Sequence, residues 1–273
     1  MTGPTPPFNP NVPSIARTYD YLLGGKDNYP ADREIGEIFI QRFPGAVQIA
    51  LDNRKCLVRA VDCMARDLGV TQFLDLGSGL PTGDNVHQVA QRSNLTARVV
   101  YVDNDPIVLA HGRALLTENE FTAVVKGDVR EPEQILNSKE TNALIDFRRP
   151  VGIIASAILH HIVDAEDPPG VIRAFRDAVR PGSYLFISHF RTLGDPDSAA
   201  LEEVMFEAFG RGAWRTDAQI AQYFERADLL APGIVPCAQW RPETDPGELS
   251  SYQRLVVAGL ASVISPTSRR KLT

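Results

Sequence analysis

The stretch Phe73-Leu-Asp75-Leu-Gly77-Ser78-Gly79 decides the fold of this 273-residue chain. An apolar run followed by two glycines one residue apart predicts a buried strand and a turn whose backbone approaches a ligand closely. The carboxylate of Asp75 indicates the charge of that ligand, because at this place it would repel a diphosphate and attract a cation. The loop therefore predicts a nucleotide-like ligand that carries positive charge.

A second acid follows the next apolar run along the chain. Asp103, followed by Asn104, closes the run Val100-Tyr-Val102 and lies 24 positions beyond Gly79 (103 − 79). This is about the spacing at which an acid reaches the ribose hydroxyls in a βαβ nucleotide site. The pattern predicts a nucleoside, and NAD enzymes share it.

A third acid, Asp128, comes just after the apolar run Thr122–Val125. Its carboxylate can accept a hydrogen bond from an adenine amino group, and the backbone N–H of Val129 can reach the ring. Aspartate at such a position also serves as a turn or helix-cap residue. The adenine contact is favoured here because the two preceding motifs lie in the right order.

Short apolar runs alternate with helical stretches from residue 70 onward. The predicted strands are Gln72–Leu76, Arg98–Val102, Thr122–Val125, Val151–Ala155 and Tyr184–Ser188. The predicted helices are Asn85–Gln91, Pro106–Glu118, Pro132–Asn137, Val171–Val179, Ser198–Phe209 and Asp217–Ala227. This alternation predicts an α/β, Rossmann-like, doubly wound sheet over residues 70–273, mostly parallel, with Arg254–Val263 as an antiparallel edge strand.

Residues 1–69 predict a helical N-terminal cap that forms one compact unit with the sheet. Apolar residues recur at helical spacing over Asp32–Phe43 and Ala46–Leu68. Pro44-Gly45 breaks the two helices, and Gly69 is a suitable residue to end the second.

Together, Asp75-Leu-Gly-Ser-Gly79, Asp103 and Asp128 resemble the three motifs of class I S-adenosylmethionine-dependent methyltransferases. More narrowly, the N-terminal segment Arg17–Asn28 resembles a bacterial methyltransferase family with a helical extension, which also shares Pro81 where a third glycine is often expected. The resemblance implies S-adenosylmethionine as cofactor and methyl transfer as activity. Its sulfonium and ammonium groups agree with a carboxylate at the first motif.

The same resemblance gives the segment Arg17–Asn28 a role as a lid over the cofactor. Arg17 would pair with the methionine carboxylate, Tyr21 would stack, and Gly24 would allow close approach. The alternative is a surface helix that ends in a Gly-Gly break.

The class I resemblance implies that cofactor and acceptor meet above the carboxyl ends of the first and fourth strands. Backbone groups of Ala155 and Ser156 are expected to contact the methionine part. His160 or His161 is a candidate general base, with packing or loop support as the alternative. His189 is a weaker candidate at the same rim, and no metal site is predicted because no fixed ligand spacing is present.

Charge and motif composition favour a small-molecule acceptor. The net charge of −6 argues against a partner with a large phosphate backbone, so a nucleic acid is not expected. Asp167-Pro-Pro-Gly170 differs from the Asp-Pro-Pro-aromatic motif of amino-methylating enzymes, because it follows the fourth strand at a distance and ends in glycine. No export signal or long apolar run is visible, which predicts a cytoplasmic protein without membrane contact.

Two alternatives to the enzyme remain open at this stage. A non-catalytic S-adenosylmethionine sensor would keep every motif found so far, since all of them belong to the cofactor side. A NAD(P)-dependent oxidoreductase is disfavoured by the charge of Asp75 and by the lack of a Tyr-x-x-x-Lys pair. An acceptor-sized cavity with polar groups would favour the enzyme over the sensor, and the sequence carries no signal for the oligomeric state.

Overall fold

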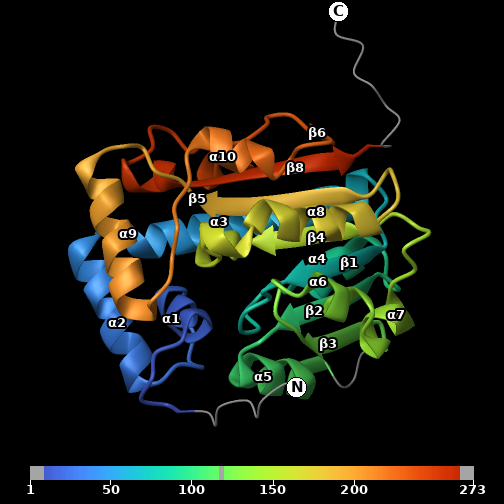
Figure 1. Cartoon of the computed structure of the whole chain (residues 1–273), viewed down its shortest axis with the longest axis horizontal. Coiled ribbons are helices and arrows are strands. Elements are labelled where there is room, and N and C mark those ends of the chain that lie inside the picture. The colour runs from blue at the N-terminus through green and yellow to red at the C-terminus, as the bar shows by residue number, and fades with distance from the viewer. Residues whose placement is uncertain (1–8, 117–119, 265–273) are drawn as a thin grey trace, which may run out of the picture.

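The computed structural model describes residues 9–116 and 120–264. Its centre is an eight-stranded sheet with the order β3-β2-β1-β4-β5-β8-β6, and β7 also pairs with β8 (Figure 1). The strands are β1 Gln72–Leu76, β2 Arg98–Asp103, β3 Thr122–Lys126, β4 Gly152–Ser156, β5 Tyr184–Phe190, β6 Ala227–Leu229, β7 Val235–Pro236 and β8 Val256–Val263. Strands β1 to β5 are parallel, and β8 is antiparallel to β5. The predicted Rossmann-like α/β fold is confirmed.

The antiparallel edge is wider than the sequence indicates. Strands β6 and β7 both pair with β8 and extend the sheet beyond it. The helix expected over Asp217–Ala227 ends at Gln222, and Ala227 already belongs to β6. Two or three residues are too few to show an alternating pattern, so these strands leave no periodicity in the sequence.

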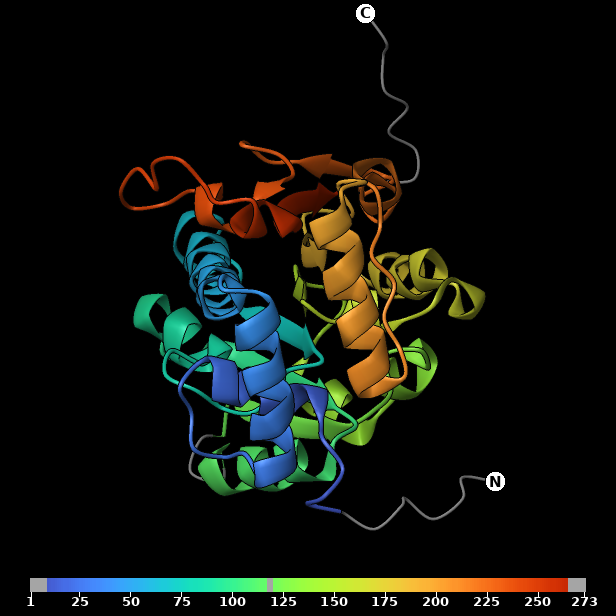
Figure 2. The ribbon, with the colours of Figure 1, turned by 90° about the vertical axis from the view of Figure 1, so that its left-hand side faces the viewer.

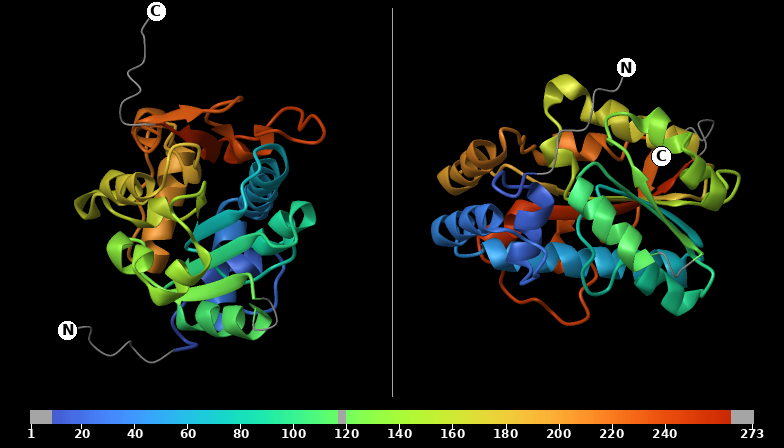
Figure 3. Two further views of the ribbon diagram at one scale, coloured as in Figure 1. Left: turned by 90° about the vertical axis from the view of Figure 1, so that its right-hand side faces the viewer. Right: turned by 90° about the horizontal axis from the view of Figure 1, so that it is seen from below.

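Helices cover both faces of the sheet, as Figure 3 shows. They are α4 Val86–Ser93, α5 Pro106–Leu116, α6 Pro132–Leu136, α7 Lys139–Leu144, α8 Pro168–Ala178 and α10 Asp217–Gln222. Phe175 of α8 and Ile135 of α6 share a buried cluster with β4 and β5 residues, whereas Val89 of α4 belongs to the cluster on the other face. The predicted end of α5, Glu118, lies outside the described residues.

The N-terminal helices are α1 Ile15–Leu22, α2 Pro30–Arg42 and α3 Ala46–Asp62, which continues as a π-turn to Asp67. Helix α3 is part of the sheet covering, because its Leu57 and Val61 lie in one buried cluster with Phe73 of β1. Helices α1 and α2, together with α9 (Pro196–Phe209), lie at the edge where the parallel strands end (Figure 2).

The remaining features of the described chain are consistent with a globular domain. Cys56, Cys63 and Cys237 are free and buried, as expected of small core residues. No helix among the described residues is long and apolar enough to cross a membrane.

Candidate functional site

The glycine loop after β1 is fixed by its backbone. The N–H groups of Gly77 and Ser78 donate to the carbonyl of Val102 at the end of β2, at 2.9 and 3.0 Å. Gly77 has φ 68° and Gly79 has φ 66°, a conformation that favours glycine. A Cβ on Gly77 would lie 2.6 Å from Cγ1 of Ile158, whereas one on Gly79 would meet nothing within 4 Å. Packing therefore requires the first glycine, and the second leaves the backbone open to a ligand.

The second motif supports the first. The carboxylate of Asp103 is buried and accepts hydrogen bonds from the N–H of Gly79 and of Asp105, each at 2.9 Å. Burial raises the pKa of Asp103 despite these bonds. Ser14, just before α1, donates from Oγ to Asp105 at 2.6 Å and so joins the N-terminal segment to this loop.

A cavity of about 290 Å³ opens beside these loops. This volume is near the lower end of the range for small-molecule sites, roughly 300–1,000 Å³. The predicted site residues among its lining are Asp75, Gly77, Ser78, Gly79, Asp103, Asn104, Ser156, His160 and His161. The structure thus brings the glycine loop, the second motif and the histidine pair to one cavity.

Asp75 faces this cavity from a buried position. Burial, assisted by the nearby charge of Asp103, raises its pKa to about 7, and Arg54 opposes the shift. Arg54 of α3 lines the same cavity, and its Nη2 donates to the carbonyls of Gly83 and Asp84 at 3.1 and 2.9 Å. A carboxylate and a guanidinium on one wall complement an amino-acid zwitterion such as the methionine part of the cofactor.

The predicted lid residues Arg17, Tyr21 and Gly24 do not line the cavity. The guanidinium of Arg17 is buried against Asp32, with Nε to Oδ2 at 2.8 Å. Tyr21 donates to Glu37 and packs its ring against α2. Gly24, with φ 77°, follows the end of α1. The expected cofactor contacts of these three residues therefore stay predictions, and none of the three lines the cavity.

A different face of α1 borders the cavity instead. The residues of this face follow the i, i+3, i+4, i+7 spacing of one side of a helix. They are Ile15, Thr18, Tyr19 and Leu22. The expectation for Tyr21 came from the family resemblance of this segment and made no use of helical spacing. The signal was present, since Ile15 and Leu22 mark the apolar side on which Tyr19 lies.

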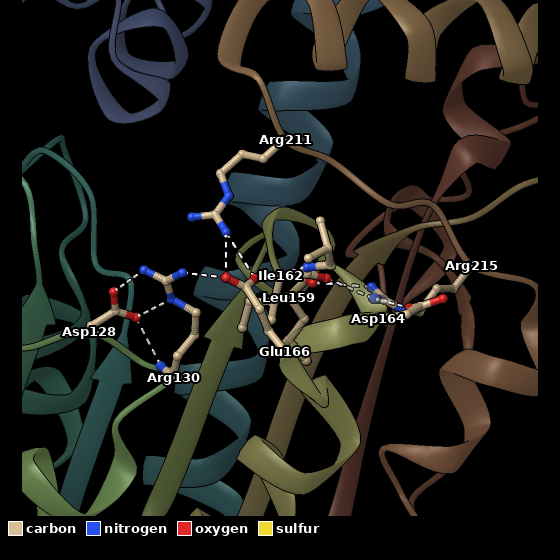
Figure 4. Close-up of polar contacts among 9 residues, drawn as sticks. Asp128, Arg130, Leu159, Ile162, Asp164, Glu166, Arg211 and Arg215 are labelled. Atoms are coloured by element: carbon tan, nitrogen blue, oxygen red, sulfur yellow. Dashed lines mark hydrogen bonds and ion pairs between the residues drawn. The ribbon is translucent and has the colours of Figure 1, made fainter.

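The third motif lies outside the cavity lining. Arg130 is the main cause of the lowered pKa of Asp128, and a hydrogen bond from Asn104 adds to it. Nε of Arg130 donates to Asp128 at 2.8 Å (Figure 4). Val129 and Ala155 are buried in the main core cluster. The adenine contact of Asp128 and Val129 and the methionine contact of Ala155 thus stay predictions, and Asn104 is the residue that links Asp128 to the cavity.

A buried polar cluster lies between α1, α3 and the strand ends, and Ser156 is the one member that the sequence had indicated. Nδ2 of Asn53 donates to Tyr19 at 2.9 Å, and the hydroxyl of Tyr19 donates to the carbonyl of Ala50 at 3.0 Å. Ser188 of β5 donates to Oδ1 of Asn53 at 2.6 Å, and Ser156 lies within 3.5 Å of Nδ2. Burial raises the pKa of Tyr19 to about 12, so this phenol stays protonated.

His160 and His161 form a 3-10 turn after β4, and both line the cavity. Their ring centroids are 4.2 Å apart, and the His160 ring meets Phe190 edge-on at 4.8 Å. Burial lowers the pKa of His161 to about 3 and the pKa of His160 well below 6.5. Both imidazoles are therefore neutral at physiological pH and suit hydrogen bonding better than strong base catalysis.

Arg215 holds this turn in place (Figure 4). It is buried and donates to the carbonyls of Leu159 and Ile162, at 3.2 and 2.8 Å, and to Asp164 at 2.7 Å. It also contacts Nε2 of His189 at 3.1 Å, and this histidine is absent from the cavity lining. In the described ranges, 9–116 and 120–264, no group of three or more His, Cys, Asp or Glu residues could hold a metal ion.

Ion pairs outside the cavity lining connect distant segments. Glu166 pairs with Arg130, beside the third motif, and with Arg211, just after α9, at 2.9 Å for the latter (Figure 4). These groups are partly exposed, so each pair is expected to contribute only about 0–1 kcal/mol. They join the segments after β3, β4 and α9 and contribute little to the stability of the fold.

The cavity fits a polar cofactor. In the described part of the chain, several buried polar atoms have no hydrogen-bond partner, and four of them belong to cavity residues: Thr18 Oγ1, Arg54 Nε, His160 Nδ1 and His161 Nδ1. Buried polar atoms are normally paired, so a group of unpaired ones around a cavity indicates a polar ligand.

Comparisons with known proteins agree with this geometry. A family model described as S-adenosyl methyltransferase matches residues 2–264. A candidate methyltransferase from Thermobifida fusca YX is 44% identical, with a TM-score of 0.91, and the match covers 97% of this chain and 100% of that one. A DUF574 family protein from Streptomyces avermitilis MA-4680 is 34% identical, with a TM-score of 0.87, covering 92% and 98%.

More distant matches show the fold alone. The N-methyltransferase NodS from Bradyrhizobium japonicum WM9, solved with S-adenosylhomocysteine, is 14% identical with a TM-score of 0.52, covering 91% of this chain and 100% of that one. No functionally curated protein matches the sequence significantly. The full-length family match decides the assignment: the chain belongs to the S-adenosyl methyltransferase family, and its cofactor is S-adenosylmethionine.

Proposed function

We propose that this chain transfers the methyl group of S-adenosylmethionine to a small-molecule acceptor bound in the same cavity. The observation that carries the proposal is the lining of that cavity. It joins the glycine loop and the acids of the first two motifs to apolar side chains of α1, α2 and α9. The cofactor would supply an electrophilic methyl group on a sulfonium, which an acceptor beside it can attack in line.

The charged residues would hold the cofactor in one orientation. The buried carboxylate of Asp103 would bind the ribose hydroxyls through its remaining lone pairs. Asp75 would pair with the ammonium group and Arg54 with the carboxylate of the methionine part. This arrangement directs the sulfonium toward Ser156 and the histidine turn, where the acceptor would lie.

His160 and His161 would position the acceptor more than activate it. A neutral imidazole with a lowered pKa accepts a hydrogen bond from a hydroxyl or amine but removes its proton only weakly before attack. Proximity and alignment would therefore supply most of the rate enhancement, as expected for a reaction with a strongly activated methyl donor.

The same lining argues against the two rival functions. A sensor binds only the cofactor, so it would not require polar residues in the part of the cavity beyond the glycine loop. Tyr19, Asn53 and His160 line this part. A NAD(P) enzyme would place a diphosphate beside Asp75, where the ionised carboxylate would repel it, so the site would have to keep this carboxyl protonated.

The test is S-adenosylhomocysteine formation with fractionated cell extract. We expect turnover with the low-molecular-weight fraction and none with the nucleic-acid or protein fraction. His160→Ala should lower kcat with little change in cofactor affinity, while Leu95→Ala, at an exposed position, serves as the control. Turnover only with a macromolecular fraction would contradict a small acceptor. Cofactor binding without turnover in any fraction would favour the sensor.

A further inference from the structure

The cavity has two ends of opposite chemistry. Among the described lining residues, those that carry charge are Arg54, Asp75, Asp103 and Asp105, and they lie on α3 and at the ends of β1 and β2. The other end, which we term the acceptor compartment, is lined by Leu22, Phe39, Phe190, Leu201, Met205 and Phe209. The sheet order places β4 between the two ends, since β1 and β5 are its neighbours on either side.

The acceptor compartment has flat, well-supported aromatic walls. The rings of Phe39 and Phe209 stack with centroids 6.2 Å apart, which joins α2 to α9. Phe190 stacks on Trp214 at 4.7 Å with an interplanar angle of 10°. Since each ring is backed by another, the walls are expected to keep their orientation and to favour a planar ligand.

The polar groups between the two ends are uncharged. Tyr19 is a protonated phenol, Asn53 and Ser156 are neutral by nature, and His160 is a neutral imidazole. A charged acceptor would lose its hydration in this compartment without a counterion, which is strongly unfavourable. The groups present can instead donate or accept hydrogen bonds with a neutral polar substituent.

We propose that the methyl acceptor is an uncharged aromatic small molecule that bears a hydroxyl group. Its ring would occupy the acceptor compartment, and its hydroxyl would point toward Tyr19 and His160. In the transfer, a lone pair on the hydroxyl oxygen forms the bond to the methyl carbon, and the electron pair of the broken S–C bond stays on sulfur. The proposal rests on the proposed function, because it names the substrate class of the same site.

The proton balance favours a hydroxyl over an alkylamine. After methylation the oxygen still carries its proton and is a far stronger acid than an imidazolium, even one whose pKa burial has lowered. His160 can therefore take that proton and pass it to water. A methylated alkylamine is a weak acid and would keep its proton against so weak a base.

The test is calorimetric binding of chosen probes to the full-length protein saturated with S-adenosylhomocysteine. We expect 2-naphthol to bind, and cyclohexanol and the anion 6-hydroxy-2-naphthoate to bind at least about tenfold more weakly. Phe209→Leu and Phe39→Leu should each weaken 2-naphthol about tenfold, the loss expected for one aromatic contact. Leu95→Ala should leave its affinity unchanged, and unchanged S-adenosylhomocysteine affinity in each variant shows that it is folded.

The proposal would be overturned if the naphthoate or cyclohexanol bound more tightly than 2-naphthol. It would also be overturned if Phe209→Leu and Phe39→Leu bound 2-naphthol as tightly as the wild type does. Failure of every probe on a protein that binds S-adenosylhomocysteine would overturn it and leave the proposed function standing. Failure of S-adenosylhomocysteine itself to bind would overturn both.

Discussion

The two ends of the cavity are built in different ways. At the charged end, Asp75 is the next-to-last residue of β1 and Asp103 the last of β2, and these parallel strands end at the same edge of the sheet. At the apolar end, Leu22, Phe39 and Phe209 come from three helices that meet only in the folded chain. Strand topology therefore fixes the charged end, whereas helix packing shapes the apolar end. Changes at the first should abolish binding, and changes at the second should alter selectivity.

The largest effect is expected at Gly77. Gly77→Ala places a Cβ 2.6 Å from Ile158 in a backbone with φ 68°. Strain of this kind costs about 1–3 kcal/mol, so S-adenosylmethionine affinity should fall by up to about 100-fold in calorimetry. Gly182→Ala is the matched control, because it has φ 85°, open space around its Cβ and no place in the cavity. Equal affinity for Gly77→Ala and the wild type would contradict the loop's role.

The next effect concerns the histidine turn. Arg215→Met removes buried charge-assisted hydrogen bonds to Leu159 and Ile162. Losing such bonds costs roughly 1.5–3 kcal/mol, which corresponds to a fall in Tm of about 3–12 °C for a domain of this size. The turnover number should fall while cofactor affinity holds. Arg211→Met, at a partly exposed ion pair, should change Tm by little, and a similar loss in both variants would refute the distinction.

The affinity for S-adenosylmethionine should depend on pH through Asp75. Its pKa is raised from 3.8 to about 7, so the carboxyl is neutral below pH 7 and charged above it. A cationic ligand favours the charged form, so the affinity should rise about tenfold between pH 6 and pH 8. Asp75→Asn should remove this rise, and the wild type should release a proton on binding at pH 7. A flat profile for the wild type would show that Asp75 does not face the cation.

The smallest effect distinguishes the two faces of α1. Tyr19→Phe removes hydrogen bonds to Asn53 and Ala50 at the cavity, whereas Tyr21→Phe removes one to Glu37 outside it. A neutral hydrogen bond contributes about 0.5–1.5 kcal/mol, so Tyr19→Phe should raise the KM for the acceptor about two- to tenfold. Tyr21→Phe should leave it unchanged. A raised KM for Tyr21→Phe together with an unchanged KM for Tyr19→Phe would instead support a place for Tyr21 at the site.

The charged end of the cavity was more predictable from the sequence than the parts that depend on helix packing. The strands β1 and β2 and the residues at their ends were predictable, because an apolar run and its terminal acid are neighbours in the chain. Asn53 and Arg54 were not, since they lie mid-helix and join the site only when α3 packs on the sheet. Tyr19 is an intermediate case, because the helical spacing of Ile15 and Leu22 places it on the apolar side of α1.

The third motif shows a second limit of sequence reasoning. Its position after β3 was predicted correctly, yet the carboxylate of Asp128 is engaged by Arg130 only two residues away. A motif gives the place of a residue in the topology and leaves its partners undetermined. Arg215 shows the converse, because a single arginine outside every motif supports the histidine turn through backbone carbonyls that no sequence pattern reveals.

The most direct test of the account is calorimetric titration of the purified protein with S-adenosylmethionine, S-adenosylhomocysteine and NAD, repeated on Asp103→Ala. We expect the first two ligands to bind, NAD not to bind, and the substitution to abolish binding, because Asp103 accepts a hydrogen bond from Gly79 and would also bind the ribose. Binding of NAD, or unchanged affinity of Asp103→Ala for S-adenosylmethionine, would contradict the assignment of the charged end to the cofactor.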